Sequence, residues 1–283
     1  MISKAWPTAS VNWMKYRLLY FAISAIFLSA GIFSLLKWGL NLGIDFTGGV
    51  VTEYQLPNGE IKNEKYGVKS EEEINKIRKD IKTQGFKELR FEVVGPAIGP
   101  ELIKKTLYAL EISAILILFW VAIQFRSIKF GVSAILAMIH DSLILVGGFS
   151  LLGHFMGVEI DFLFVTAVLT ILSFSVHDTI VVYDRIREKQ RKYDPMLGSD
   201  MTKIANSALT ETMVRSINNS FTIIFMLLAL VLVGGDTIRW FGVALLIGTI
   251  SGTYSSPFVA VPILVTWEEI SNRFKNREKK LKK

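Results

Sequence analysis

Long apolar runs, separated by short polar connections, dominate the pattern of hydrophobic and polar positions. Each run approaches or exceeds the roughly 18 residues that a helix needs to cross about 30 Å of hydrocarbon. The pattern predicts an α-helical polytopic membrane protein with one transmembrane helix in each run. Gly248 and Gly252, four residues apart in the last run, predict a close approach to a neighbouring helix. The six runs cover residues 17–38, 106–125, 131–153, 161–184, 219–235 and 239–266.

Residues 39–105, between the first two runs, show the shorter periods of a small folded domain. Residues 50–56 alternate between apolar and polar positions, which predicts a strand, and residues 88–93 alternate in the same way. Between them, residues 74–81 carry isoleucine every three or four positions, which is typical of one helix face. We expect a small α+β, ferredoxin-like domain that buries little core alone and leans on a partner or on the span ends. Its sequence contains no catalytic triad, Cys/His metal spacing or Gly-rich phosphate loop, so we interpret it as a binding or scaffolding domain.

The positions of the charged residues along the chain say more about function than the overall composition does. Of the 283 residues, 51% are hydrophobic, the mean hydropathy is +0.41 and the net charge is +7. In a soluble protein this charge would suggest a nucleic-acid partner, but the basic residues lie beside the spans. We therefore expect a lipid bilayer and no nucleic acid. The chain has no cysteine, which excludes disulfides, and no clear cleavage site follows the first run, which we interpret as a retained anchor.

Lys and Arg are distributed unevenly between the two sides of the membrane. They gather in four segments: residues 1–16, 126–129, 185–218 and 267–283. The short loops on the opposite side contain only Arg239. The positive-inside rule then predicts a cytoplasmic N-terminus, a cytoplasmic loop at 185–218, a basic cytoplasmic tail and an extracytoplasmic domain at 39–105.

One apolar stripe in the 185–218 loop repeats at helical spacing. A helix with such a stripe, set beside basic residues, is typical of a segment that lies on the membrane surface. We therefore expect an amphipathic helix on the cytoplasmic interface. The stripe consists of Met201, Ile204, Ala205, Ala208 and Leu209.

Few titratable side chains lie near the middle of a span. His140 and Asp141 are in the third run, and His177 and Asp178 are in the fourth. A charged carboxylate costs about 2.5–3.5 kcal/mol on insertion scales, so each is expected to face the bundle interior and meet a partner. Arg215 opens the fifth span on the side where the fourth span ends, so the Asp178 and Arg215 ends are available to each other.

A dry carboxylate favours its neutral acid, whereas a nearby guanidinium favours the charged form. Alternating water access and Arg215 proximity at Asp178 could therefore load and unload a proton. The structural alternative is that Asp178 pairs with Arg215 or caps a helix. The structural alternative for Asp141 is that His140 merely forms a hydrogen bond or ion pair with its carboxylate. Both readings stay open at this point.

Five stretches resemble the SecD/SecF family of protein-export membrane proteins, and the "GTYSS" turn favours its SecF branch. They occur in the family's order around six spans and extend over essentially the whole chain. The stretches are GIDFTGG (43–49), GPAIGPEL (95–102), MIHD (138–141), SVHDTIVVYDRIRE (175–188) and GTYSSPFVA (252–260).

The resemblance implies a member of the resistance–nodulation–division superfamily in the cytoplasmic (inner or plasma) membrane. It implies a heterodimer with a SecD homologue, attached to the SecYEG translocon, in which the proton motive force helps to draw out a translocating preprotein that the ATPase SecA has pushed in. YidC and YajC are expected as functional partners. No cofactor or metal and no enzymatic activity are implied. The coupling ion is H+, with Na+ as the alternative.

Carried over by position, Asp178 and Arg215 match the family residues implicated in proton coupling. His177 stands where family members commonly have Asn, and a second titratable group there could change the properties of Asp178. We regard Asp141, His140 and His177 as secondary candidates.

The GIDFTGG stretch has an architectural explanation. Gly48 and Gly49 allow a tight exit from the first span into the first strand, and Asp45 is expected to cap or turn that junction. We therefore interpret these three residues as a family motif that shapes the domain entry.

Other classes of function remain as alternatives. The chain could be a non-coupling scaffold that stabilises the translocon, with its charged residues serving assembly. Efflux of small molecules is disfavoured because such pumps carry two large outer domains and twelve spans in one chain. An enzyme has little support because no nucleophile and base are paired in the outer loops and the histidines lack metal spacing.

Overall fold

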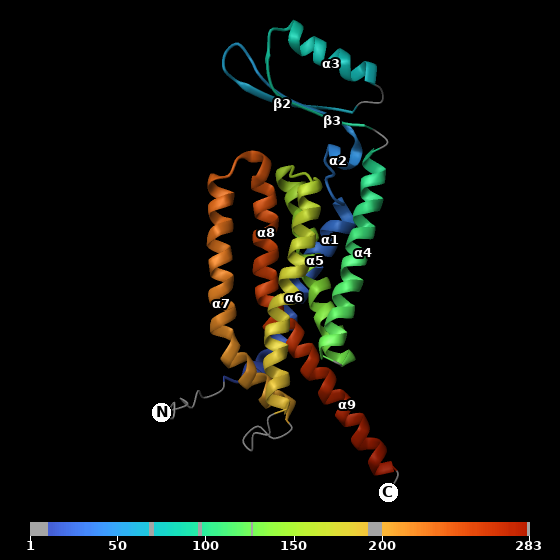
Figure 1. Cartoon of the computed structure of the whole chain (residues 1–283), viewed down its shortest axis with the longest axis vertical. Helices are drawn as coiled ribbons and strands as arrows, with labels where there is room; N and C mark the ends of the chain where they lie inside the picture. Colours follow the sequence, from blue (N-terminus) through green and yellow to red (C-terminus); the bar gives the residue numbers. More distant parts are fainter. Residues whose placement is uncertain (1–10, 68–70, 96–97, 126, 192–199, 282–283) are drawn as a thin grey trace.

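The computed structural model describes residues 11–67, 71–95, 98–125, 127–191 and 200–281. Within these ranges, six helices are long and apolar enough to cross a membrane, and a small α+β domain (residues 49–94) is attached between the first and second of them (Figure 1). The predicted fold class is confirmed.

Nine α-helices, three strands, one 3-10 turn and one π-helical turn occur within the described residues, and the π-helical turn η2 joins α8 directly to α9. They are η1 (Trp13–Tyr16), α1 (Arg17–Trp38), α2 (Ile44–Thr47), β1 (Gly49–Gln55), β2 (Ile61–Tyr66), α3 (Glu71–Thr83), β3 (Lys87–Val94), α4 (Ile98–Phe125), α5 (Ile128–Met156), α6 (Phe162–Arg191), α7 (Met201–Val233), α8 (Asp236–Ser255), η2 (Ser256–Ala260) and α9 (Val261–Leu281).

The sheet of the α+β domain has the strand order β2-β1-β3, and β1 is antiparallel to both neighbours. Strands β2 and β3 therefore run parallel, are joined through α3 and have β1 between them, which is the split βαβ arrangement of ferredoxin-like folds. The hydrophobic pattern did not predict β2. Its sequence, IKNEKY, is polar on both faces because it is an edge strand with little burial on either side.

One face of β1 forms the small core of this domain. Val50, Thr52 and Tyr54 are buried, as their alternation predicted. A bulge between Glu53 and Tyr54 shifts the pairing with β3, so that Glu88 lies opposite Tyr54. Glu88 then meets Arg78 of α3 at 2.7 Å, and this hydrogen bonding holds the pKa of Glu88 below its ordinary value. The regular alternation expected along residues 88–93 is interrupted for this reason.

The α+β domain is joined to the helices at the loop between α5 and α6. The Gly43 amide donates to the Ile160 carbonyl at 2.8 Å, and the Ile160 amide donates to the Asn41 carbonyl at 2.8 Å. Lys65 of β2 forms an ion pair with Glu159 of the same loop. The domain thus leans on the ends of the spans, which was one of the two expected supports.

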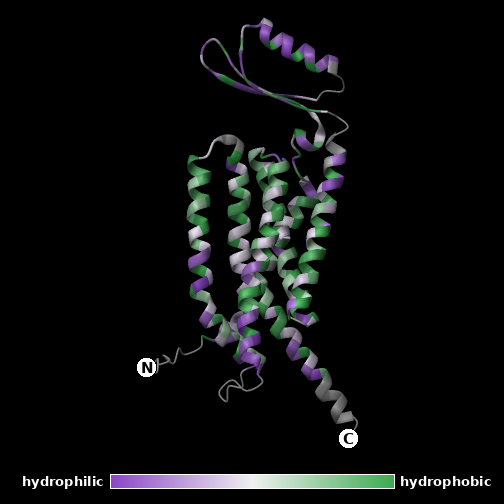
Figure 2. Ribbon diagram, in the orientation of Figure 1, coloured by the Kyte–Doolittle hydropathy of each residue, from purple (hydrophilic) through white to green (hydrophobic). Residues whose placement is uncertain are grey.

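The helix bundle is organised around α5, α6 and the span formed by α8, η2 and α9. In their most apolar windows 44%, 56% and 56% of residues are buried, compared with 6% in α4 and 11% in α7. Figure 2 shows a mostly hydrophobic bundle with polar residues at the end opposite the α+β domain. At that end lie η1, the start of α7 and the projecting part of α9 (Figure 1).

The expected helix with an apolar stripe is present, but its stripe is covered by other helices and not by lipid. Residues 201–218 form the first part of the continuous helix α7, and the apolar stripe belongs to the buried core. This part of α7 is covered by protein: the Met14 amide donates to Asn206 Oδ1 at 2.9 Å, and Trp13 Nε1 donates to Thr210 Oγ1 at 3.1 Å. The stripe is apolar because it contacts other helices, and a lipid surface would require the same pattern.

Glycines bring pairs of helices close together. A Cβ on Gly147 of α5 would lie 2.5 Å from Gly31 Cα of α1, and a Cβ on Gly248 of α8 would lie 2.4 Å from the Ile171 side chain of α6. The predicted close approach at Gly248 and Gly252 is therefore confirmed. The approach at Gly147 tolerates a larger side chain less well than the approach at Gly248, because at Gly147 two backbones meet and neither can move aside.

We predict that Gly147→Ala lowers the free energy of unfolding by about 1–3 kcal/mol, since overpacking forces α1 and α5 apart. Gly148→Ala is the matched control. Its Cβ would meet only Ile247 Cδ1, at 3.9 Å, and alanine favours the helix by roughly 0.5–1 kcal/mol. Reversible unfolding of both variants in mixed micelles measures the difference. Equal stability of the two variants would contradict the close packing of α1 on α5.

Candidate functional site

A buried carboxylate, Asp141 of α5, lies inside the helix bundle with only 1% of its surface exposed. Ser175 Oγ of α6 and Ser255 Oγ of α8 each donate to its Oδ2 at 2.5 Å. Ser251 Oγ of α8 donates to Oδ1 at 2.6 Å, and His140 Nδ1 lies 3.0 Å from the same oxygen. These five residues, which we call the Asp141 cluster, join three helices through one side chain.

The Asp141 cluster fits an ionised carboxylate. Such a group only accepts hydrogen bonds, and hydroxyl donors about 2.5–2.7 Å away are typical of charge-assisted bonds. Because ionised Oδ1 cannot donate, Nδ1 of His140 carries the hydrogen, and neutral imidazole then has Nε2 as an acceptor. Nε2 is buried and has no hydrogen-bond partner within the described ranges. The cluster can therefore hold a negative charge in the bundle, with one imidazole nitrogen left unmatched.

Asp178 of α6 has a different environment. It is 4% exposed, and the donor to it in the part of the chain that the structure describes is Ser216 Oγ of α7, at 2.9 Å from Oδ2. The sequence placed Asp178 and Arg215 at neighbouring helix ends, and Arg215 indeed precedes Ser216. However, the Arg215 side chain is exposed and forms no ion pair with Asp178 among these residues. His177 is exposed as well, since consecutive helix residues point in directions about 100° apart.

Polar side chains continue along α6 from the Asp141 cluster. Thr179 Oγ1 donates to the Ser175 carbonyl at 3.0 Å and lies 2.9 Å from Ser256 Oγ of the π-helical turn η2. Pro257 in that turn has no amide hydrogen, so the regular helix bonding is interrupted there. π-Helical turns occur frequently at functional sites. Since Ser175 and Asp178 are three residues apart, both acidic sites lie along one region of α6.

The family motif contacts the other end of α6. Asp45 Oδ2 accepts a hydrogen bond from the Phe162 amide at 2.8 Å, so it caps α6 and not the exit from α1. Burial raises the pKa of the adjacent Asp161 carboxyl, and the Asp45 charge acts in the same direction. Gly48 and Gly49 have φ values of +72° and +135°, and they turn the chain from α2 into β1, whereas the exit from α1 lies earlier, at Gly39. A Cβ on Gly49 would also lie 2.6 Å from the Tyr66 carbonyl oxygen.

The serines that surround Asp141 were missed by sequence reasoning. Small polar residues are common in membrane helices, so none stands out alone. The available signal was the four-residue spacing of Ser251 and Ser255, which puts both on one face of α8. Among the described residues, no group of three or more His, Cys, Asp or Glu side chains is close enough to hold a metal ion.

Comparisons with known proteins agree with these motifs. A family sequence model for "Protein export membrane protein SecD/SecF, C-terminal" matches residues 73–270, and one for the "SecD/SecF GG Motif" matches residues 33–56. The chain is similar to protein translocase subunit SecF of Thermobaculum terrenum, with 39% identity across 91% of this chain and 94% of the relative. For subunit SecF of Anaerolinea thermophila the identity is 35%, across 95% of this chain and 98% of the relative.

Solved structures give the same result for the fold. The chain is similar to the crystal structure of SecDF, a translocon-associated membrane protein from Thermus thermophilus, with a TM-score of 0.80 and 30% identity across 93% of this chain. A crystal structure of SecDF in a super-membrane-facing form gives a TM-score of 0.73 and 30% identity across 96% of this chain. The chain spans 40% of each of those SecDF chains.

We predict that Ser255→Ala lowers the free energy of unfolding by about 1.5–3 kcal/mol, because a buried carboxylate loses a charge-assisted donor. Ser142→Ala is the matched control on α5. Within the described ranges its hydroxyl bonds only the Met138 carbonyl of its own helix, so its removal is expected to change stability by less than about 0.5 kcal/mol. Unfolding in mixed micelles at neutral pH measures both. If Ser255→Ala is as mild as the control, Asp141 is not held as an anion by this hydroxyl.

Proposed function

The chain belongs to the SecD/SecF family of protein-export membrane proteins, and from that membership we propose that it is the SecF subunit of the Sec translocase accessory complex. In this role it works with a SecD homologue beside the SecYEG translocon and promotes a late stage of preprotein translocation. The match to 40% of each SecDF chain supports a second, SecD-type chain as the partner.

Polar residues on the outside of the bundle support a partner within the membrane. Glu111 of α4 and His177 of α6 are exposed although both lie within apolar spans. A charged side chain that faces lipid near the middle of a span costs about 2.5–3.5 kcal/mol, so contact with another protein is favoured. We propose that the SecD homologue covers these residues.

The coupling proton is carried by Asp178 in this proposal, and Na+ is the alternative ion. The observation that carries it is the contrast between two buried carboxylates. Among the residues that the structure describes, Asp141 has four donors directed at it, which suits a permanent anion, whereas Asp178 has the single hydroxyl of Ser216. A protonated carboxyl donates one hydrogen bond itself, and a hydroxyl can turn to accept it. Asp178 can therefore be satisfied in either protonation state.

Arg215 supplies the switch in this mechanism. While the Arg215 side chain is exposed and away from Asp178, the buried Asp178 carboxyl lies in a dry site that favours the neutral acid. Movement of α7 that brings the guanidinium to Asp178 would favour the anion and release the proton. Because Ser216 and Arg215 are adjacent, a local rearrangement of α7 exchanges one contact for the other.

The orientation of the chain in the membrane is part of the proposal. Basic residues near the ends of α6 and α9 support a cytoplasmic location for both termini, with the α+β domain outside. The protein then acts as a proton-coupled transport subunit and not as an enzyme. A non-coupling scaffold is the second candidate, and it is favoured by the Asp141 cluster, whose bonds stabilise the bundle whether or not a proton moves.

We predict that Asp178→Asn and Arg215→Met, made separately, reduce gradient-driven preprotein export to the level measured without a gradient. Either change removes one state of the switch. Asp184→Asn is the control, since it neutralises an exposed carboxylate on the same helix and is expected to leave export unchanged. Inverted membrane vesicles that contain the SecD partner allow the measurement, under a proton gradient and under a sodium gradient.

Copurification with the SecD partner must be equal for all variants. Full export by assembled Asp178→Asn and Arg215→Met complexes would contradict proton coupling and would favour the second candidate, a non-coupling scaffold. A response to the sodium gradient alone would replace H+ by Na+.

A further inference from the structure

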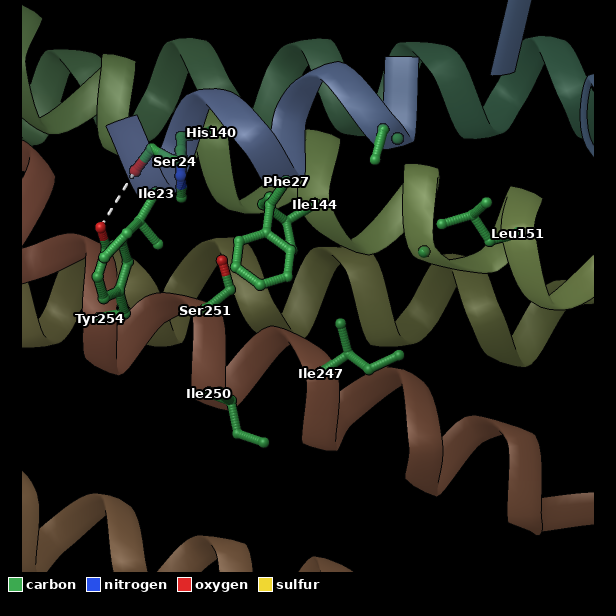
Figure 3. Close-up of a pocket in the computed structure, with 13 residues that line it drawn as sticks. Ile23, Ser24, Phe27, His140, Ile144, Leu151, Ile247, Ile250, Ser251 and Tyr254 are labelled. Atoms are coloured by element: carbon green, nitrogen blue, oxygen red, sulfur yellow. Dashed lines mark hydrogen bonds between the residues drawn. The ribbon is translucent and has the colours of Figure 1, made fainter. Parts of the chain in front are cut away.

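A cavity of about 430 Å³ lies between α1, α5 and α8, beside the Asp141 cluster (Figure 3). Its walls are mainly aliphatic and aromatic side chains, which is typical of sites for apolar molecules. Phe27 and Ile250 at its edge are 62% and 52% exposed, whereas His140 is only 5% exposed. The cavity therefore extends from the outer surface of the bundle to a buried imidazole.

His140 belongs to the wall of the cavity, and one acceptor of its ring is unused among the described residues. Nδ1 of His140 is committed to Asp141, and Nε2 is the buried atom without a partner among the described residues. A buried acceptor with no partner carries a desolvation penalty, so a donor in the cavity would stabilise the protein.

The hydroxyl groups in the wall already donate elsewhere. Ser251 donates to Asp141, Tyr254 donates to the Tyr20 carbonyl at 2.7 Å, and Ser24 donates to Tyr254 Oη at 3.4 Å. Each retains lone pairs that can accept. A molecule that fits this polar end must therefore bring its own hydrogen-bond donor, and the lining residues include no Lys or Arg to balance a negative charge.

The length of the cavity suits an extended alkyl chain. His140 and Leu151, both in its wall, are eleven residues apart on α5, which corresponds to about 16 Å. That is roughly one leaflet of a hydrocarbon core about 30 Å thick. A charged lipid headgroup is excluded, because the polar end lies deep within α5 and far from the membrane surface.

We propose that this cavity binds a neutral single-chain lipid alcohol from the bilayer, with its hydroxyl donating to His140 Nε2 and its alkyl chain lying between α1, α5 and α8. The ligand would complete the hydrogen bonding of the imidazole that supports Asp141. It would also fill the gap beside α1, which contacts α5 tightly at Gly31 and Gly147.

The test uses a dodecanol probe with a photoreactive diazirine in its chain, and a dodecane probe with the same group but no hydroxyl. The full-length chain in phosphatidylcholine nanodiscs is labelled, and the labelled residues are identified by mass spectrometry. We expect the alcohol to label the cavity walls about 3- to 10-fold more than the alkane, which is the effect of one net hydrogen bond. Unlabelled dodecanol is expected to compete.

Two variants separate the hydroxyl contact from the cavity. His140→Phe keeps a ring but has no acceptor. Labelling by the alcohol probe should therefore fall to the level of the alkane probe, and labelling by the alkane probe should stay unchanged. Gly148→Leu places a side chain in the cavity, where an added Cβ would meet only Ile247 Cδ1 at 3.9 Å, and should abolish labelling by both probes. Because Gly148→Leu leaves the Asp141 cluster intact, it keeps the test decisive if His140→Phe does not fold.

Equal labelling by the two probes, or labelling that Gly148→Leu does not reduce, would overturn the proposal. Labelling spread over the exposed faces of α4 and α7 would do the same, since it reports general contact with lipid. The experiment is repeated with the SecD partner bound. Loss of labelling there would assign the cavity to a partner helix and would also overturn the lipid site.

Discussion

A carboxylate inside a membrane protein must be either surrounded by donors or neutral, and this constraint governs the centre of the bundle. Asp141 and Asp178 meet it differently. Asp141 receives donors from three helices and so fixes α5, α6 and α8 to one another. Asp178 has one hydroxyl donor in the described part of the chain, and it comes from the peripheral helix α7. The same requirement therefore produces a rigid unit around one acid and a replaceable contact around the other.

The short reach of serine sets the distances between the helices. A serine hydroxyl can bond Asp141 only if the backbones are close, and the glycines of α8 permit this. A Cβ on Gly252 would lie 3.4 Å from Ser175 Cα, and one on Gly248 would strike Ile171. The glycines that predicted close packing and the serines that hold the carboxylate thus serve one arrangement. A larger residue at either glycine would move Ser251 and Ser255 away from Asp141.

The sequence predicted what hydropathy and spacing determine directly. The six spans follow from length and apolar content, and the entry at Gly48 and Gly49 follows from backbone freedom. Strand β2 was missed because an edge strand needs no apolar face. The stripe on α7 was assigned to lipid because periodicity identifies a buried face but not what covers it. The exposed position of Arg215 depends on how α7 sits against α6, which no local pattern encodes.

The capping role of Asp45 could not be predicted locally either, because it joins residues 117 positions apart. It matters for the proposed function because α6 carries Asp178 near its middle and this cap at its start. The sixteen helical steps from Phe162 to Asp178 span about 24 Å of continuous helix. A displacement at Asp178 can therefore reach the α+β domain through a rigid element.

How the α+β domain would respond depends on which joint is weaker. The Asn41–Ile160 and Gly43–Ile160 bonds are paired backbone contacts, and Asp45 adds the cap beside them. The Lys65–Glu159 ion pair joins side chains that are 49% and 30% exposed, and pairs of this kind contribute only about 0–1 kcal/mol. The ion pair would open first. The domain would then pivot about the backbone joint at the start of α6, with its sheet swinging away from the loop that holds Glu159.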